Sequence, residues 1–545
     1  MSKVNLYNRE ALLQQIDSPD KWDVLIIGGG ATGLGVALDS AVRGYRTLLL
    51  EQVDYAKGTS SRSTKLVHGG VRYLAQGDLG LVKEALYERG LMLQNAPHLV
   101  KNQSFIIPNY KWWGGIFYTL GLKVYDLLAG RLSLGKSIPI DRKETLDRIG
   151  TLKPEKLKGG VLYHDGQFDD SRLAVNIAQT CIEKGATLLN HFQVTQLTKD
   201  GEGIVNGVVA MDKETNKEYV LPAKVVINAT GVFTDQILKM DNKDAKNMVR
   251  PSQGIHLVLD KSFLPGEDAI MIPKTNDGRV LFLVPWHNRV LVGTTDTVLD
   301  DHSLEPIALD KEIDFIIETA NSYLSKRVGR EDVLSIFAGL RPLAAPQDGS
   351  EKTKEISRSH KILISNSHLL TITGGKWTTY RKMAEDTMEK AIKLGKLPKK
   401  ECATTHLPIH GATQELDPTD HLSVYGSDRK AILELIEKSP KLGEKLHPKM
   451  EFLCAEVVWA VRNEMARTVE DVLARRVRAL FLDAQASIDM APKVAEIMAL
   501  ELNRDQAWQQ KQLADYNAIA IHYVLQESVA SDKQQKINLK TKISN

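Results

Sequence analysis

Gly28, Gly30 and Gly33 lie between a strand pattern and a helix pattern near the start of the chain. The apolar run Trp22–Ile27 leads directly into them, and a helical pattern follows. Gly28 permits a tight turn, Gly30 lets the backbone approach a pyrophosphate, and Gly33 allows the helix to pack closely on the strand. Glu51 ends the next apolar run and could accept hydrogen bonds from a ribose hydroxyl. This spacing predicts a dinucleotide site with phosphates at the helix N-terminus.

Size and composition indicate a soluble protein of several domains. A chain of 545 residues is too long for one core and predicts two to four domains. Its 71 Lys and Arg residues against 68 Asp and Glu residues give a net charge of +3, so nothing argues for a nucleic-acid partner. Cys181, Cys402 and Cys454 are far apart and show neither metal-ligand nor disulfide spacing. We therefore expect no metal site, three buried thiols and a reducing compartment.

The sequence predicts no segment that crosses a membrane. The first twenty residues lack the apolar core of a secretory signal, and no uncharged apolar run reaches 18 residues. The segment 111–123 is aromatic and is flanked by Lys111 and Lys123. It is too short to span, so two interpretations stay open: a helix in a membrane interface, or a buried part of an accessory domain.

Further strand and helix patterns place other elements beside the fingerprint. We expect helices over 79–95 and 171–184, and mainly helical structure beyond about 418. The apolar run 224–231 predicts a buried parallel strand that opens onto small residues, and 369–376 repeats that strand–glycine junction. Nucleotide contacts spread over such separated segments favour FAD over NAD. Alternating patterns between 250 and 335 predict an antiparallel sheet.

Five motifs occur in order along the chain. They are the glycine fingerprint at 28–33, Gly58–Leu74, Asn228–Gly231, Gly339–Pro342 and Gly374–Lys382. Together they resemble the FAD-dependent glycerol-3-phosphate dehydrogenase family over residues 20–400, and the helical end is similar to that family's C-terminal domain.

The resemblance implies an α/β fold of three parts. A Rossmann-like FAD-binding domain would comprise 20–105, 160–248 and 335–400, and a mainly antiparallel substrate domain 106–159 and 249–334. A C-terminal α-helical domain would follow at 408–525, and residues 526–545 are expected to form a disordered tail.

The resemblance also implies which side chains bind and oxidise glycerol 3-phosphate. Arg72, Arg341 and Arg358 match the positions that bind the phosphate and the rest of the substrate, and arginine suits a doubly charged phosphate. Tyr73 could add a hydroxyl donor. Oxidising a secondary alcohol needs a base tuned towards neutral pH.

His256 and Lys376 both match active-site positions of the family, and the sequence does not decide which of them is the base. We favour His256 as the base and Lys376 as the group that stabilises the alkoxide, with Arg341 also counted among the catalytic residues. The remaining residues expected at FAD by the same likeness are Thr59, Ser60, Ser61, Lys65, His68, Gly69, Ala229, Gly231, Gly375, Lys376 and Thr378.

The expected activity is therefore oxidation of sn-glycerol 3-phosphate to dihydroxyacetone phosphate, with electrons passed from FAD to a membrane quinone. The resemblance implies a peripheral position on the cytoplasmic face of the inner membrane, and a homodimer is left open. Three alternatives remain: an oxidase that uses oxygen, an amino-acid oxidase-like enzyme, and a flavoprotein scaffold whose helical domain does the work.

Overall fold

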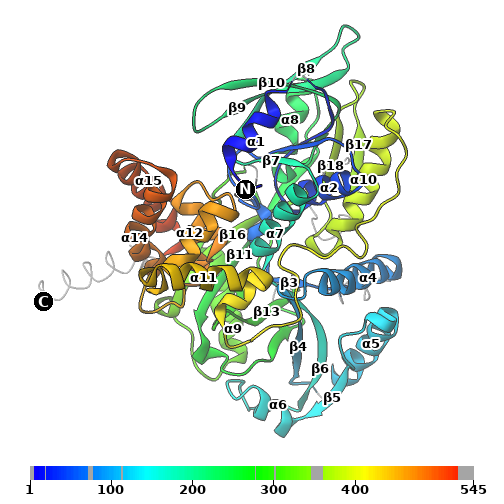
Figure 1. The fold of residues 1–545 in the computed structure, drawn as a ribbon. Helices are drawn as coiled ribbons and strands as arrows, with labels where there is room; N and C mark the ends of the chain where they lie inside the picture. The colour runs from blue at the N-terminus through cyan, green and yellow to red at the C-terminus, as the bar shows by residue number, and fades with distance from the viewer. Residues whose placement is uncertain are drawn as a thin grey trace, which may run out of the picture.

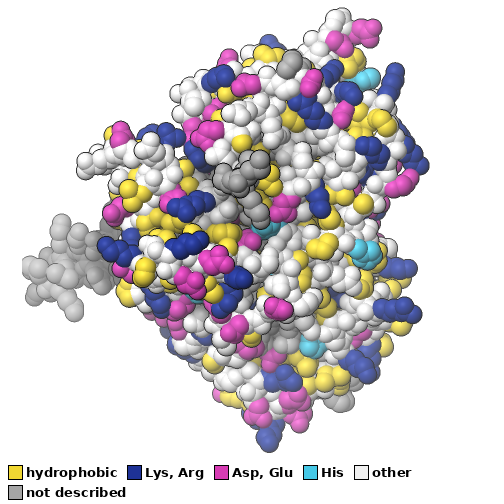
Figure 2. All heavy atoms as spheres, viewed as in Figure 1, with side chains coloured by type: hydrophobic (Ala, Val, Ile, Leu, Met, Phe, Trp, Pro, Cys, Tyr) yellow, Lys and Arg dark blue, Asp and Glu magenta, His cyan; other side chains and the backbone are white. Residues whose placement is uncertain are grey.

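The computed structural model describes residues 5–18, 20–70, 78–111, 114–275, 278–299, 302–344 and 360–525. Two sheets lie one above the other in Figure 1, and the C-terminal helices, coloured orange to red, lie on one flank of the molecule. Figure 2 shows cationic and anionic side chains interspersed over this face, as the small net charge leads one to expect.

The first sheet has a parallel centre. Its strands, in spatial order, are β17 (Lys361–Ile364), β18 (Leu370–Thr373), β10 (Glu218–Asn228), β1 (Trp22–Ile27), β2 (Thr47–Leu50) and β7 (Thr187–Leu189). From β18 to β7 the strands run parallel, whereas β17 is antiparallel to β18. Strands β9 (Val205–Asp212) and β8 (Phe192–Lys199) extend β10 as antiparallel neighbours. The predicted buried parallel strand is confirmed as the end of β10.

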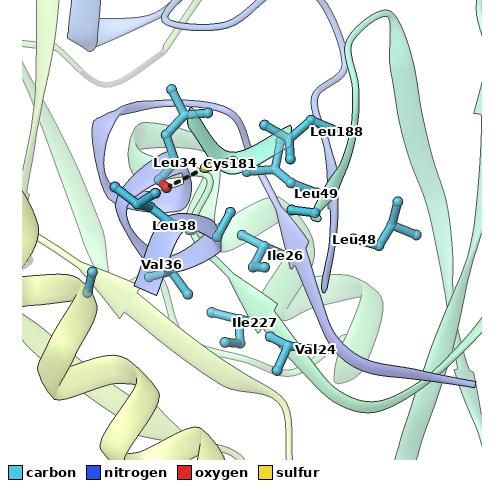
Figure 3. Packing of buried hydrophobic residues seen from close by; sticks show 14 of the residues in the cluster. Val24, Ile26, Leu34, Val36, Leu38, Leu48, Leu49, Cys181, Leu188 and Ile227 are labelled. Carbon is cyan, nitrogen blue, oxygen red and sulfur yellow. Dashed lines mark hydrogen bonds between the residues drawn. The ribbon is translucent and has the colours of Figure 1, made fainter. Parts of the chain in front are cut away.

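Helices α2 (Ala31–Val42), α7 (Asp170–Glu183) and α10 (Tyr380–Leu394) pack around this sheet, with α2 against the other two. Figure 3 shows side chains of α2, among them Leu34 and Leu38, facing those of β1, β2 and β7. The buried Cys181 of α7 donates to the Leu34 carbonyl at 3.6 Å. Cys454 is also buried and Cys402 is partly exposed, so burial is confirmed for two of the three thiols.

The second sheet is mainly antiparallel, as predicted. Its main path runs β15 (Thr297–Val298), β11 (Val249–Asp260), β14 (Arg289–Gly293), β13 (Leu281–Trp286), β12 (Ala269–Ile272), β4 (Val100–Asn109), β6 (Gly159–Phe168) and β3 (Leu66–Val67). Strand β16 (Val333–Ala344) pairs with β11, and β5 (Ile138–Asp141) with β6. Helices α4 (Leu79–Asn95), α5 (Gly114–Ala129), α6 (Arg142–Arg148) and α9 (Asp310–Tyr323) belong to the same part of the chain.

Four strands differ from the predicted division of the chain. Residues 66–67, 100–105, 160–168 and 335–344 were expected in the FAD-binding domain, but they lie in the second sheet. The reason is their pairing, because β6 follows β4 over its whole length and β16 follows β11. The other limits of the division stay a prediction.

The C-terminal region is helical, as predicted. Its helices are α11 (Arg429–Lys438), α12 (Cys454–Asn463), α13 (Ala479–Leu482), α14 (Ala484–Leu502) and α15 (Gln506–Ala520). Their core is continuous with the second sheet, since Trp286 and Phe337 pack into the same cluster as Phe481. The expected tail, 526–545, lies outside the described residues. In the described part of the chain, no helix combines the length and apolarity needed to cross a bilayer.

Candidate active site

The turn after β1 brings helix α2 unusually close to two strands. Gly28 has a φ of +109°, and a Cβ there would lie 2.8 Å from the Ala229 carbonyl oxygen. A Cβ at Gly33 would lie 1.9 Å from the Gly28 carbonyl oxygen. Any side chain at either position would push α2 away from the strands. The tight turn and the close packing expected of these two glycines are therefore present.

Glu51 holds the glycine turn in place from the end of β2. Its Oε2 accepts the Gly29 N–H at 2.6 Å, and its Oε1 accepts the Val53 N–H at 2.9 Å. Burial raises the pKa of Glu51, and these two hydrogen bonds oppose that rise. The carboxylate also lines the cavity beside the turn, where its remaining lone pairs can accept hydroxyl hydrogen bonds.

A cavity lies at the carboxyl ends of the parallel strands. Three separated segments meet there: the fingerprint with Gly30 and Ala31, the small residues Ala229 and Gly231, and the junction 372–377. The Ser60 hydroxyl accepts the Ala31 N–H at 2.9 Å, and a Cβ at Gly30 would crowd that hydroxyl at 3.1 Å. A glycine-lined cradle at a helix N-terminus with a carboxylate beside it fits an elongated dinucleotide.

A second cavity lies between the two sheets, next to the first. Thr59, Pro342 and residues 373–377 line both cavities, so the two share a wall. The cationic side chains of the second cavity exceed the acidic ones. They are Arg62, Arg279, Arg341, Lys361 and Lys376, against Asp165 and Asp296.

His256 lies in the wall of the second cavity, on β11. Its Nε2 is 2.9 Å from the Thr64 hydroxyl, and its ring stacks on Phe337 with 4.9 Å between ring centroids. Burial holds the pKa of His256 well below its usual value, and the charges of Lys65 and Arg341 lower it further. The imidazole is therefore neutral near pH 7, but its pKa lies below the neutral range expected of the base, which makes it a weaker proton acceptor in this state of the site.

Arg341 lies on β16, close to His256. Its Nη2 donates to the Thr294 hydroxyl at 3.2 Å, and its Nη1 lies 3.6 Å from Asp296. Gly254, on the neighbouring strand, makes room for the guanidinium, because a Cβ there would lie 2.2 Å from Nη2. Arg341 and His256 thus face one cavity from paired strands.

Lys376 lines both cavities. This is the position expected of a residue that contacts both the cofactor and the substrate. The residues after it tie this junction to other segments. Trp377 donates its indole N–H to the Ser60 carbonyl at 2.8 Å, and the Thr378 hydroxyl accepts the His68 N–H at 3.3 Å. His68 lines the second cavity.

Three residues expected at the cofactor point elsewhere. Lys65 is fully buried, and its ammonium group donates to Asp170 and to the Ser61 carbonyl, each at 2.7 Å. Ser61 is 1% exposed and its hydroxyl lies 3.4 Å from the Gly58 carbonyl. Gly69 packs against α4 and α5, and its N–H donates to the Tyr125 hydroxyl at 2.7 Å. None of the three lines either cavity.

The other predicted residues fall into two groups: those that line a cavity and those that lie outside the described residues. Thr59, Ser60, Ala229, Gly231, Gly375 and Thr378 all line one or both cavities. Arg72, Tyr73 and Arg358 lie outside the described residues.

Sequence reasoning missed several side chains of the second cavity, among them Arg62, Thr64 and Arg279. Arg62 and Thr64 lie inside the Gly58–Leu74 motif, so the signal was present but did not distinguish them from their neighbours. Arg279 follows a turn and has no motif around it. Arg62 is buried and forms an ion pair with Glu305 at 2.7 Å.

Comparison with known proteins agrees with this geometry. The model of the FAD dependent oxidoreductase family matches residues 23–381, and that of the C-terminal domain of alpha-glycerophosphate oxidase matches residues 366–509. A probable mitochondrial glycerol-3-phosphate dehydrogenase of Caenorhabditis elegans is 41% identical, over 93% of this chain and 74% of its own length. The mitochondrial glycerol-3-phosphate dehydrogenase of Homo sapiens is 39% identical over the same shares.

The chain belongs to the FAD-dependent glycerol-3-phosphate dehydrogenase family. A solved structure of this family, the enzyme of Bacillus halodurans complexed with FAD, is 30% identical, has a TM-score of 0.78, and covers 95% of this chain and 98% of its own. The L-alpha-glycerophosphate oxidase of Mycoplasma pneumoniae has a TM-score of 0.53 at 16% identity, a likeness of fold alone. FAD is thus the cofactor, and the first cavity has the residues to hold it.

Proposed function

We propose that this enzyme oxidises sn-glycerol 3-phosphate to dihydroxyacetone phosphate in the second cavity and passes the electrons to a membrane quinone. The observation that carries the first half is the placement of His256 and Arg341 in one cavity that shares lining residues with the dinucleotide cavity. A neutral base and a guanidinium in that position suit a phosphorylated alcohol.

The substrate phosphate binds cationic side chains of the second cavity, among them Arg341 and Arg279. Arg72 and Arg358, expected at the phosphate, remain proposed partners. The C2 hydroxyl gives its proton to Nε2 of His256 as a hydride leaves the same carbon. Bound FAD supplies the hydride acceptor. Lys376, at the junction, stabilises the alkoxide by its positive charge.

His256 is favoured as the base over Lys376 for a physical reason. Because burial lowers the pKa of His256 well below its usual range, the ring is unprotonated at neutral pH. In the tautomer with its proton on Nδ1, the lone pair of Nε2 accepts the Thr64 hydroxyl, so the substrate hydroxyl must take the place of this hydrogen bond to give its proton to Nε2. Thr64, 2.9 Å from Nε2, orients the ring towards the cavity.

A peripheral position on the cytoplasmic face of the inner membrane, with quinone as acceptor, is the second half of the proposal. Helix α5 supports it, because Leu120 and Leu127 are 67% and 79% exposed and Val124 is 40% exposed on the same helix. Exposed leucines on a helix beside lysines suit a membrane interface. Of the two interpretations left open for 111–123, this favours the interfacial one.

The first experiment is the visible absorbance of the purified enzyme without oxygen, before and after adding glycerol 3-phosphate. Bleaching of the flavin band, with glycerol as a control that leaves the band intact, is the expected result. A flavin band that ignores glycerol 3-phosphate would contradict the proposed substrate. Bleaching by amino acids instead would favour the amino-acid oxidase-like alternative.

A second experiment separates quinone from oxygen as acceptor. Glycerol 3-phosphate is added to the enzyme with a soluble quinone or with oxygen, and the rate of re-oxidation is followed. Rapid turnover with the quinone and slow turnover with oxygen are expected. The oxidase alternative predicts the reverse, and the match to an oxidase C-terminal domain is the observation that keeps it in view.

A further inference from the structure

The C-terminal helical domain reaches the back of the proposed catalytic base. Phe481, on α13, packs edge-on against Phe337 with 4.8 Å between ring centroids and 61° between ring planes. Phe337 in turn stacks on His256 at 4.9 Å and 18°. The three rings form a column that begins in the helical domain and ends in the wall of the second cavity.

A second route starts at Arg478, immediately before α13. This arginine is 1% exposed and has the left-handed φ of +66°. Its Nη2 donates to Asp170 at 3.0 Å and lies 3.3 Å from the Ser61 carbonyl oxygen. Its Nη1 donates to the Ser171 hydroxyl at 2.9 Å. The guanidinium is therefore fixed in one orientation under the loop that precedes β3.

Asp170 connects Arg478 to the loop by hydrogen bonds. Its Oδ2 accepts the N–H and the hydroxyl of Ser63 at 3.1 and 2.7 Å, and the Lys65 ammonium at 2.7 Å. Thr64 lies between these two anchored residues, and it is the residue that contacts Nε2 of His256. The loop position of Thr64 thus depends on Asp170, and that of Asp170 on Arg478.

We propose that the C-terminal helical domain positions the catalytic base, with Arg478 and Phe481 as positioning residues for His256. The inference rests on the proposed role of His256. Neither residue lines either cavity, so neither touches substrate or cofactor. They act through Thr64, which contacts the Nε2 edge of the imidazole, and through Phe337, which stacks on its face.

Stability alone is a weak reason for an arginine at this position. Buried ion pairs often contribute little net stability compared with apolar residues of similar size, because desolvation offsets the attraction. The left-handed backbone at Arg478 adds a further cost for a residue with a Cβ. A role in holding one loop geometry accounts for the same features, since the hydrogen bonds from both Nη atoms of Arg478 fix the arrangement of the groups that they join.

The test compares three variants, each with a conservative substitution. Arg478→Lys keeps the charge but loses the planar fork, and Phe481→Leu keeps an apolar side chain but loses the ring. Arg467→Lys is the matched control. Arg467 lies in the same domain and makes a bidentate pair with Glu214 at 2.6 and 2.7 Å, but lines neither cavity.

For each variant, FAD content, melting temperature, the anaerobic rate of flavin bleaching and KM for glycerol 3-phosphate are measured over a range of pH. Arg478→Lys should slow bleaching about tenfold per bound FAD with KM within about twofold, because misplacement of a base affects the chemical step. Phe481→Leu should shift the acidic limb of the pH–rate profile to higher pH. Burial is the main cause that lowers the pKa of His256, so admitting water raises it.

Rates and pH profiles that match the Arg467→Lys control would overturn the inference. If Arg478→Lys does not retain FAD, Phe481→Leu alone decides the outcome. Failure of the proposed function looks different, since the unmodified enzyme would then show no bleaching with glycerol 3-phosphate, and the inference would fall with it.

Discussion

Gly293 faces His256 directly across the β11–β14 pair, and a Cβ at Gly293 would lie 2.1 Å from Cδ2 of the imidazole. On the other side, the ring stacks on Phe337 of β16. The imidazole is therefore held between two neighbouring strands, and the absence of a side chain at Gly293 leaves the space that the ring occupies.

Replacing Gly293 by Ala should disable His256 without removing it. The new methyl group must displace the ring, so we expect flavin bleaching by glycerol 3-phosphate to slow by about 10²-fold, the cost of an ångström-scale misplacement. Stopped-flow absorbance measures this, with FAD content as a check on folding. Gly201→Ala is the control, because open space surrounds that glycine. An unchanged rate in Gly293→Ala would mean that His256 need not occupy this position.

Local signals in the sequence were enough for the glycine turn of the cofactor cavity. Gly28 and Gly33 are close in sequence to the strand and helix that they join, so their spacing alone predicted the turn. Gly293 and Thr64 could not be predicted in this way. Each matters because it touches His256, and only the pairing of β11 with β14 and the fold of the loop before β3 bring them there.

Lys65 shows why a motif does not fix the direction of a side chain. It belongs to the same motif as Thr59, which does line the cavities. Its ammonium group instead meets Asp170, a carboxylate that lies far along the chain at the start of α7. Burial lowers the pKa of Lys65 to about 7, and Asp170 opposes this. The competing partner was invisible without the fold.

Arg341→Ala should weaken substrate binding. Loss of a charge-assisted hydrogen bond to phosphate costs about 1.5–3 kcal/mol, so KM for glycerol 3-phosphate should rise roughly 10- to 100-fold. Steady-state kinetics with a soluble quinone measure this. Arg330→Ala, which removes an arginine paired with Asp310 and Asp314 on α9, should leave KM unchanged. Equal KM values in the two variants would remove Arg341 from the phosphate site.

Lys376→Met should slow the chemical step while FAD remains bound. Methionine keeps the length of the side chain but loses the charge that stabilises the alkoxide, and a loss of about 10²-fold in the rate of flavin bleaching is expected. The same substitution at Lys393, exposed near the end of α10, is the control. A normal bleaching rate in Lys376→Met would show that this lysine has another role.

The ion pairs of His410 should make the stability of the fold depend on pH. Burial lowers the pKa of its imidazole, but hydrogen bonds to Asp428 and Glu183, both at 2.7 Å, outweigh this and raise it to about 9. A raised pKa stabilises the fold fully below the unfolded value of about 6.5, and the gain is lost as pH rises through 9. The melting temperature of His410→Gln should therefore approach that of the wild type between pH 6.5 and 9.

The control for this measurement is His406→Gln, because His406 is exposed. The difference in unfolding free energy at pH 6 should reach up to about 3 kcal/mol for His410→Gln, and it should shrink at pH 9 and above. A difference that does not change with pH would mean that the charged imidazole is not what stabilises this contact.

Leu127 offers a direct test of membrane contact. If α5 lies in the interface, a carboxylate at Leu127 must enter the headgroup region in place of an apolar side chain that contributes about 1.5–3 kcal/mol on burial. Leu127→Glu should therefore bind vesicles of mixed anionic and neutral phospholipid at least about tenfold more weakly in a sedimentation assay. Leu500→Glu is a matched control, because Leu500 on α14 is equally exposed at 79%. If only Leu500→Glu binds more weakly, the membrane lies against the helical domain instead. If both variants bind vesicles as tightly as the unmodified enzyme, neither leucine is in the membrane contact.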